Sequence, residues 1–147
     1  MPNTTRLPPI VIVEDSDEDF ETVKEAVRKA GIVAEIRRAK TGGDCLEMLR
    51  DVVAVRPAVV LMDLNTPGTD GREALAAIKK DDALKVCQVV VFTTSADPRD
   101  LNFCYAAGVN AYHIKPVRYP DHLQLVAELL TYWLGRVALP LPKGGQP

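Results

Sequence analysis

Four apolar runs in this sequence are each followed or closed by side chains that can do chemistry. Two runs lead into carboxylates, one into a hydroxyl and one into an ammonium: Glu14 and Asp15 after residues 10–13, Asp63 after 59–62, Thr93 after 89–92, and Lys115 after 111–114. Carboxylate oxygens are ligands that Mg²⁺ prefers in proteins. An ammonium and a hydroxyl can bind the oxygens of a phosphoryl group. Together these residues predict a site for a divalent cation and a phosphoryl group.

Asp63 is the candidate nucleophile, because a carboxylate can accept a phosphoryl group as an acyl phosphate. Magnesium would neutralise the carboxylates and the incoming phosphoryl oxygens. Lys115 would pair with one of those oxygens, and the Thr93 hydroxyl would donate to another. Such a reaction depends on positioning and charge neutralisation and needs no separate general base.

The acidic run at residues 14–19 has a simpler explanation in part. Residues 17–19 stand at the start of a predicted helix, where acids complement the helix dipole, with Ser16 or Asp17 as the N-cap. Glu14 and Asp15 belong instead to the end of the preceding strand. Two adjacent carboxylates near Asp63 would repel one another unless a cation lay between them, which favours a metal site.

The other three motifs also have structural alternatives. Asp63 could cap the turn at residues 65–71, Thr93 could satisfy a backbone group, and a loop lysine is usually solvated. Lys115, however, lies between a buried strand and Pro116, where a free ammonium is unfavourable, so its predicted partner is Asp63. The Lys115–Pro116 bond is a candidate cis peptide.

Short apolar runs alternate with segments of helical spacing along nearly the whole chain. The predicted strands are residues 10–13, 33–36, 58–62, 89–92 and 111–114, and the predicted helices are 20–30, 46–53, 74–78, 101–108 and 123–137. Strand–helix units in series imply parallel strands joined by right-handed crossovers. An open, doubly wound α/β sheet of this kind brings the carboxyl ends of its strands to one edge, where ligands bind. The four motifs would meet there.

Composition is that of an ordinary single domain. The chain has 147 residues, 47% of them apolar and 26% charged, and its net charge is −2. This charge gives no reason to expect nucleic acid or an anionic membrane as a partner, and no apolar run is long enough to span a bilayer. Cys45, Cys87 and Cys104 lack metal-ligand spacing, and we expect buried, reduced thiols in a cytoplasmic protein.

The four motifs together resemble the receiver domain of two-component response regulators over residues 8–137. The resemblance rests on Glu14–Asp15, the segment 63–71, Thr93 and Lys115–Pro116. It implies a flavodoxin-like (βα)5 fold with a five-stranded parallel sheet in the order 2-1-3-4-5. It further implies that Asp63 is loaded by a histidine kinase, and that the protein catalyses its own phosphorylation and dephosphorylation without being a metabolic enzyme.

The resemblance also implies roles for individual residues. Mg²⁺, or Mn²⁺ in its place, would be bound by Asp15, Asp63 and the backbone carbonyl of Asn65, with Glu14 acting through a bound water. Thr93 and Tyr112 would form a switch pair, in which the hydroxyl moves toward the phosphoryl group and the aromatic ring turns inward. Tyr112 could equally be a simple core or edge aromatic.

A narrower resemblance is to single-domain regulators paired with bacterial phytochromes. It is carried by five short segments, namely residues 71–75, 91–95, 109–112, 132–134 and 138–140. The kinase would then be a light-sensing histidine kinase. The predicted receiver is followed only by a Pro-rich arm at residues 138–147, so we expect the signal to leave through protein contacts or onward phosphotransfer.

The last predicted helix has an apolar arc wider than one core-facing stripe requires. The helix could be buried deeply between its neighbours or covered by the tail that follows it. Alternatively, the helix and its arm could form a symmetric dimer interface. We favour the dimer, through a surface with Leu125, Leu129, Tyr132 and Trp133. His113 and His122 have no metal-ligand partners at suitable spacing and are expected to be structural or solvated.

Three other functions compete with phosphoacceptance. A haloacid dehalogenase-type hydrolase would need a second Asp at position 65, where this chain has Asn65. A flavodoxin-like flavin carrier would need a phosphate-binding loop after the first strand, where the acids at residues 14–17 would repel a phosphate. A pseudo-receiver that acts only as a protein-interaction module remains the main alternative.

Overall fold

Strands and helices alternate strictly along the chain in the computed structural model, which describes residues 7–51, 56–68 and 70–140. The elements are β1 (Ile10–Val13), α1 (Asp17–Lys29), β2 (Ile36–Ala39), α2 (Gly42–Arg50), β3 (Val59–Met62), α3 (Gly71–Lys80), β4 (Val89–Thr93), α4 (Pro98–Ala107), β5 (Ala111–Ile114) and α5 (Tyr119–Gly135).

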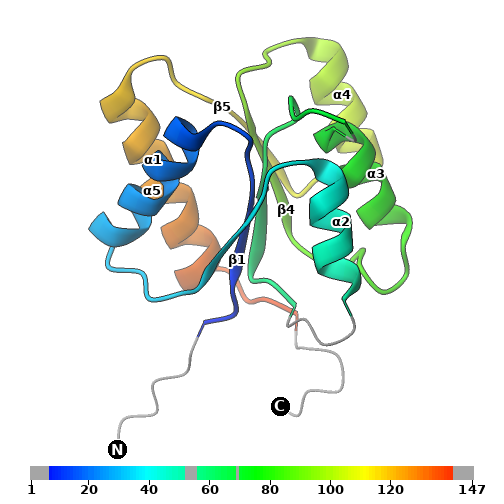
Figure 1. The fold of residues 1–147 in the computed structure, drawn as a ribbon, viewed down its shortest axis with the longest axis horizontal. Helices are drawn as coiled ribbons and strands as arrows, with labels where there is room; N and C mark the ends of the chain where they lie inside the picture. Colours follow the sequence, from blue (N-terminus) through cyan, green and yellow to red (C-terminus); the bar gives the residue numbers. More distant parts are fainter. Residues whose placement is uncertain (1–6, 52–55, 69, 141–147) are drawn as a thin grey trace, which may run out of the picture.

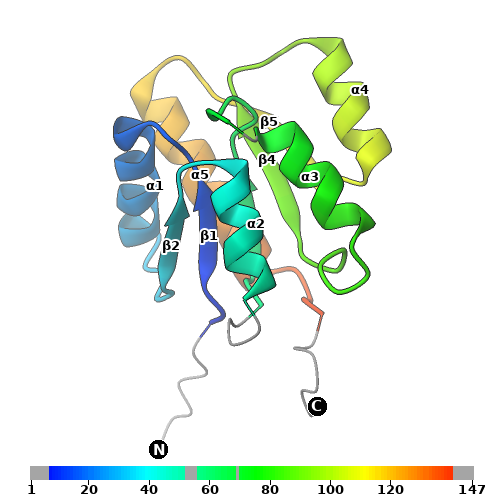
Figure 2. The ribbon, with the colours of Figure 1, turned by 45° about the vertical axis from the view of Figure 1, so that its right-hand side comes forward.

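The strands form one parallel sheet in the order β2-β1-β3-β4-β5. Helices α1 and α5 cover one face of the sheet, and α2, α3 and α4 cover the other (Figures 1 and 2). The predicted flavodoxin-like (βα)5 fold and its strand order are therefore confirmed.

Alternating side chains of the central strands build two separate cores. On β1, Ile10 and Ile12 pack with the α1 and α5 side, whereas Val11 and Val13 pack with the α2, α3 and α4 side. Strands covered on both faces must be apolar at every position. This is why β1, β3 and β4 were recognisable in the sequence as continuous apolar runs.

The edge strand β2 lies later in the chain than predicted. The expected strand at 33–36 is wrong, and the observed strand is Ile36–Ala39. It contains Arg37 and Arg38, so its apolar signal is weak. Arg38 nevertheless makes two specific contacts. Its guanidinium lies 4.6 Å from the centre of the Phe20 ring, and its Nε donates to the Glu14 carbonyl at 3.0 Å.

Helix boundaries follow local capping chemistry. The Ser16 side chain accepts a hydrogen bond from the Asp19 N–H at the start of α1, as predicted for an N-cap. Gly108, with φ of 102°, ends α4 in the left-handed conformation that glycine adopts without strain. Helix α5 begins earlier than predicted, with Pro120 in its first turn. Val53 and residues 141–147 of the predicted arm lie outside the described residues.

Within the described residues, no helix combines the length and apolar character that crossing a bilayer requires.

Candidate functional site

The predicted site residues are placed by the ends of neighbouring parallel strands. Backbone pairing continues one residue past each strand. The Glu14 N–H donates to Ala39, the Asp63 N–H to Val13, and the Lys115 N–H to Thr93, at 2.9, 3.0 and 2.7 Å between N and O. The three residues are therefore held by the rigid sheet and not by free loops.

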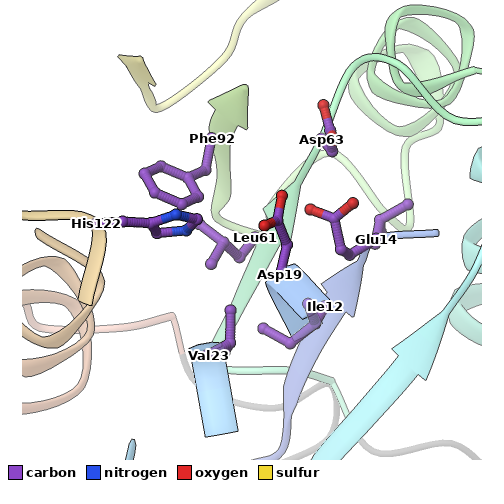
Figure 3. Close-up of a pocket in the computed structure, with 9 residues that line it drawn as sticks. Ile12, Glu14, Asp19, Val23, Leu61, Asp63, Phe92 and His122 are labelled. Carbon is purple, nitrogen blue, oxygen red and sulfur yellow. The ribbon is translucent and has the colours of Figure 1, made fainter. Parts of the chain in front are cut away.

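A buried ion cluster surrounds the Lys115 ammonium. Its Nζ donates to Glu14 Oε1 at 2.7 Å, to Asp19 Oδ2 at 2.7 Å and to Asp63 Oδ2 at 3.1 Å. Only 4% of the Lys115 side chain is exposed, against 6% for Glu14, 9% for Asp63 and 30% for Asp19. We call these four residues the lysine cluster. Figure 3 shows the carboxylates of Glu14 and Asp19 lying close together near Asp63.

Burial and mutual charge shift the titration of this cluster. Burial raises the pKa of Glu14 to about 7, against the lowering effect of the hydrogen bond and charge of Lys115. Burial alone would lower the pKa of Lys115, but its hydrogen bonds to Asp19 and Glu14 and the charges of Glu14 and Asp63 raise it above its ordinary value. Lys115 is therefore charged at neutral pH, and it cannot balance all the acids around it.

The same acids form a candidate cation site. One carboxylate oxygen from each of Glu14, Asp15 and Asp63 lies within 4.8 Å of the other two. Asp15 is exposed, so the group is open to solvent on its side. A set of hard oxygen donors with an open side and an excess of negative charge fits Mg²⁺, which keeps several water ligands.

The loop after Asp63 is fixed by short-range contacts. The Asn65 N–H donates to Asp63 Oδ1 at 3.1 Å, which turns the chain directly after the carboxylate. At Gly71 a Cβ atom would lie 2.4 Å from the Asp63 carbonyl oxygen and 2.8 Å from Leu64 Cα. Glycine is therefore required for α3 to begin this close to the strand end.

A second ion cluster ties this loop to the start of α4. Arg72 donates from Nε and Nη2 to the two oxygens of Asp100 at 2.6 and 2.8 Å, and from Nη1 to Asp70 at 3.2 Å. The Ser95 hydroxyl donates to Asp100 at 2.5 Å, and Asn65 Oδ1 lies 3.4 Å from Arg72 Nη2. We call these five residues the arginine cluster. The hydrogen bonds from Arg72 and Ser95 lower the pKa of Asp100 to about 2.

The two predicted switch residues both contact the β4–α4 loop. Thr93 is fully buried, and its Oγ1 lies 3.5 Å from Asn65 Nδ2 and accepts from the Ser95 N–H at 3.4 Å. Tyr112 is half-buried against the core on the α3 and α4 side, and its hydroxyl donates to the Ser95 carbonyl at 2.9 Å. Ser95 thus connects Thr93, Tyr112 and the arginine cluster.

Sequence reasoning found the strand-end residues and predicted the Lys115–Asp63 contact, but it missed other partners. Asp19 was assigned to the helix dipole, yet it contacts Lys115. Ser95 was expected only to flank the phosphoryl group, and the contacts between Arg72 and Asp100 were not predicted, because they depend on how α3 and α4 pack. The predicted cis Lys115–Pro116 bond is wrong, since no peptide bond in the described chain is cis.

The residues predicted for a dimer interface fall into two groups. Leu129 is 5% exposed and belongs to the core beneath α5, and Leu125 and Trp133 are half-buried against that core. Tyr132 is 55% exposed, with its ring edge against Trp133. The wide apolar arc of α5 thus reflects mainly burial against the sheet and α1, so Leu129 is not part of a surface.

Comparison with known proteins agrees with this fold. Residues 10–127 match the family described as the response regulator receiver domain. The chain therefore belongs to the receiver-domain family of response regulators.

Among individual relatives, the chain is similar to response regulator Rcp1 of Synechocystis sp. (strain ATCC 27184 / PCC 6803 / Kazusa). The two are 36% identical over 135 residues, which cover 89% of this chain and 92% of Rcp1. The probable methanogenesis regulatory protein FilR2 of Methanothrix harundinacea (strain 6Ac) is 36% identical over 129 residues, covering 86% of this chain and 83% of FilR2.

Solved structures of such regulators have the same fold. The phosphorylated cyanobacterial phytochrome response regulator RcpA gives a TM-score of 0.87 at 34% identity, over 91% of this chain and 99% of RcpA. The Mn²⁺-bound form of Rcp1 gives a TM-score of 0.86 at 35% identity, over 90% of this chain and 99% of Rcp1.

Proposed function

We propose that this protein is a stand-alone response regulator that accepts a phosphoryl group on Asp63 from a histidine kinase. The observation that carries the proposal is the surroundings of Asp63. One carboxylate oxygen is 3.1 Å from the buried Lys115 ammonium, and the carboxylate lies within 4.8 Å of oxygens from Glu14 and Asp15. The proposed nucleophile, a fixed cation and the proposed metal ligands thus lie together at the carboxyl ends of the parallel strands.

The residues of this site have different roles in phosphoryl transfer. The Asp63 carboxylate attacks phosphorus, and Lys115 neutralises one of the phosphoryl oxygens. The Thr93 hydroxyl donates to another of those oxygens and, with Tyr112, passes the change to the β4–α4 loop through Ser95. The face containing α4 and β5 would then shift between two packings.

Mg²⁺ is the proposed cofactor, held by Asp15, Asp63 and the Asn65 carbonyl, with Glu14 acting through water. The ion supplies charge neutralisation to the carboxylates and the phosphoryl oxygens. Mn²⁺ can replace it, since the related regulator Rcp1 has a Mn²⁺-bound form. The donor set of hard carboxylate oxygens suits either ion.

The proposed kinase is a phytochrome-type light sensor in the cytoplasm. The proposal rests on the likeness to RcpA, a cyanobacterial phytochrome response regulator. Residues 8–137 would form the receiver, and 138–147 the arm. Output would pass to a downstream protein or a phosphotransfer partner.

A homodimer is proposed as the signalling form. Tyr132 on α5 is exposed, and further large exposed apolar side chains lie on α4, at the end of β5 and before or at the start of α5, namely Leu101, Phe103, Tyr105, Ile114, Val117 and Tyr119. Apolar side chains gathered on neighbouring elements are typical of an interaction surface. Sedimentation of the protein with and without phosphorylation tests the dimer, and Tyr119→Ser should weaken it.

The experiment that tests phosphoacceptance is the intact mass after incubation with Mg²⁺ and acetyl phosphate. We expect one phosphoryl adduct on the native chain, none on Asp63→Asn, and loss of labelling when Mg²⁺ is chelated. No adduct with either acetyl phosphate or a phosphorylated histidine kinase, under conditions that label a control receiver, would favour the pseudo-receiver. In that case the domain would act only by protein contact.

A further inference from the structure

Asp19 is a partly buried partner of Lys115, and its position at the start of α1 does not by itself explain this contact. It lies in the first turn of α1, but Ser16 already caps this helix by accepting from the Asp19 N–H. Its carboxylate turns inward to Lys115, at 2.7 Å, and is 30% exposed. Asp17, two residues earlier, is 81% exposed and pairs with Arg38 instead. The two acids of this helical turn therefore have different partners: Asp17 pairs with Arg38, and Asp19 with Lys115.

The donors of Lys115 match its acceptors one for one. An ammonium has three N–H groups, and the structure gives it three carboxylates, of Glu14, Asp19 and Asp63. Glu14 and Asp63 come from adjacent strand ends, whereas Asp19 reaches Lys115 from α1. Lys115 is thus held from more than one direction.

The surroundings of Asp19 show why a third carboxylate matters. Figure 3 shows it beside a small pocket whose other walls include Val23, Leu61, Phe92 and His122. The Phe92 ring centre is 5.9 Å from Lys115 Nζ. Glu14 and Asp63 also line this pocket, but each already accepts a hydrogen bond from Lys115, and the four walls just named carry no carboxylate. Without Asp19, one N–H of Lys115 would face a largely apolar pocket or rotate away from it.

We propose that Asp19 is a positioning residue for phosphoryl transfer. It holds the Lys115 ammonium in place while one N–H of that ammonium changes its acceptor from Asp63 to a phosphoryl oxygen. The proposal rests on the proposed function. In the reaction, an Asp63 carboxylate oxygen forms a bond to phosphorus, and the bond from phosphorus to the donor's leaving group breaks, its electron pair leaving with that group. One N–H of Lys115 passes from Asp63 to a phosphoryl oxygen, while the other two stay on Glu14 and Asp19.

An ammonium that is held in one position affects the rate of phosphoryl transfer in two ways. A cation already in place when charge develops on the phosphoryl oxygens needs no rearrangement during the reaction. A cation shared among three anions also binds Asp63 less tightly than one shared between two, so the nucleophile remains more reactive. Removing the charge of Asp19 should therefore slow the transfer, even though Asp19 acts through Lys115 and is not itself one of the proposed metal ligands.

The test compares the initial rate of labelling by acetyl phosphate, read as intact mass, at saturating Mg²⁺. Asp19→Asn is nearly isosteric and leaves the Ser16 cap in place, so the fold should be retained. We expect it to slow labelling about tenfold, because the amide oxygen can still accept from Lys115 but carries no negative charge to hold the ammonium. Glu18→Gln, which removes an acid from the same helical turn, is the matched control and should label at the native rate.

Labelling of Asp19→Asn in a Lys115→Met background distinguishes a positioning role of Asp19 from a structural one. If Asp19 acts through Lys115, Asp19→Asn should cause no further slowing when added to Lys115→Met. Equal slowing in both backgrounds, or native labelling of Asp19→Asn, would overturn the role of Asp19 while leaving phosphoacceptance intact. A native chain that takes no phosphoryl group at all would instead overturn the proposed function, and this inference with it.

Discussion

The lysine cluster and the arginine cluster border the same Asp63 loop, but they balance charge in opposite ways. Lys115 is 4% exposed and faces three carboxylates, with Asp15 close by. Arg72 is 29% exposed and spreads its contacts over two carboxylates, the Asn65 amide oxygen and the Leu64 carbonyl. The first cluster leaves a buried excess of negative charge, and the second uses the planar fork of arginine to satisfy nearly every group.

The difference separates chemistry from support. Buried carboxylates that outnumber their cation cost stability, and such groups persist where a metal ion or a reaction uses them. A bidentate Arg–Asp pair with a serine hydroxyl on the same carboxylate has no such excess to relieve. Changes to the lysine cluster should therefore alter phosphorylation first, whereas changes to the arginine cluster should alter stability first.

The largest expected effect is that of Lys115→Met on phosphorylation. Loss of the ammonium removes the fixed charge beside the phosphoryl oxygens, and labelling by acetyl phosphate should slow about 100-fold. The measurement is the initial rate of adduct formation by intact mass at saturating Mg²⁺.

Lys79→Met provides a matched control for that variant. The Lys79 ammonium also has three acceptors, but they are the uncharged oxygens of Lys85, Cys87 and Asn110, away from the site. This variant should lose stability and still label at the native rate. Equal slowing in both lysine variants would mean that labelling reports general loosening of the fold and not the site.

The arginine cluster should show the converse behaviour. Asp100→Asn breaks the bidentate pair with Arg72, and we expect it to lower the free energy of unfolding by about 2 kcal/mol at neutral pH. The rate of Asp63 labelling should change much less than stability does, since Asp100 does not contact the Asp63 carboxylate. Urea denaturation and mass labelling of the same samples check both statements.

The pH dependence of this stability follows from the pKa of Asp100. Its pKa is lowered from 3.8 to about 2 in the folded protein, chiefly by the hydrogen bond from Arg72. A lowered folded pKa stabilises the fold above the unfolded value and ceases to do so as pH falls through the folded value. The difference in unfolding free energy between native and Asp100→Asn proteins should therefore be constant above about pH 5 and shrink between about pH 4 and pH 2. A gap that stays constant down to pH 2 would show that the carboxylate charge is not responsible.

Sequence reasoning could reach one of these clusters and not the other. Glu14, Asp63 and Lys115 were predictable because each directly follows an apolar strand, and parallel strands bring their carboxyl ends to one edge. Asp19 and Asp100 lie in helices, where an acid in the first turn already has an explanation in the helix dipole. Which of them turns inward depends on how α1 and α4 pack, and that information is not local.

The same reasoning accounts for the errors in the fold. β2 was misplaced because Arg37 and Arg38 interrupt its apolar pattern, although the guanidinium of Arg38 lies over the Phe20 ring. The apolar arc of α5 was interpreted as an interface because a pattern does not show how deeply a helix is buried. Leu129 is 5% exposed and packs in the core.

Asp15→Asn should have a weaker effect than the other variants, and it should raise stability instead of lowering it. Asp15 contributes an exposed carboxylate within 4.8 Å of oxygens from Glu14 and Asp63. Without a divalent cation these like charges repel, so Asp15→Asn should raise the melting temperature by a few degrees in chelator. In Mg²⁺ the native protein should be stabilised and the variant should not, since the variant has lost a ligand. Glu73→Gln, which removes an exposed acid from the start of α3, should melt like the native protein in chelator. A lower melting temperature for Asp15→Asn in chelator would mean that the acids of the lysine cluster are already balanced without a metal ion, and the contrast between the two clusters would then disappear.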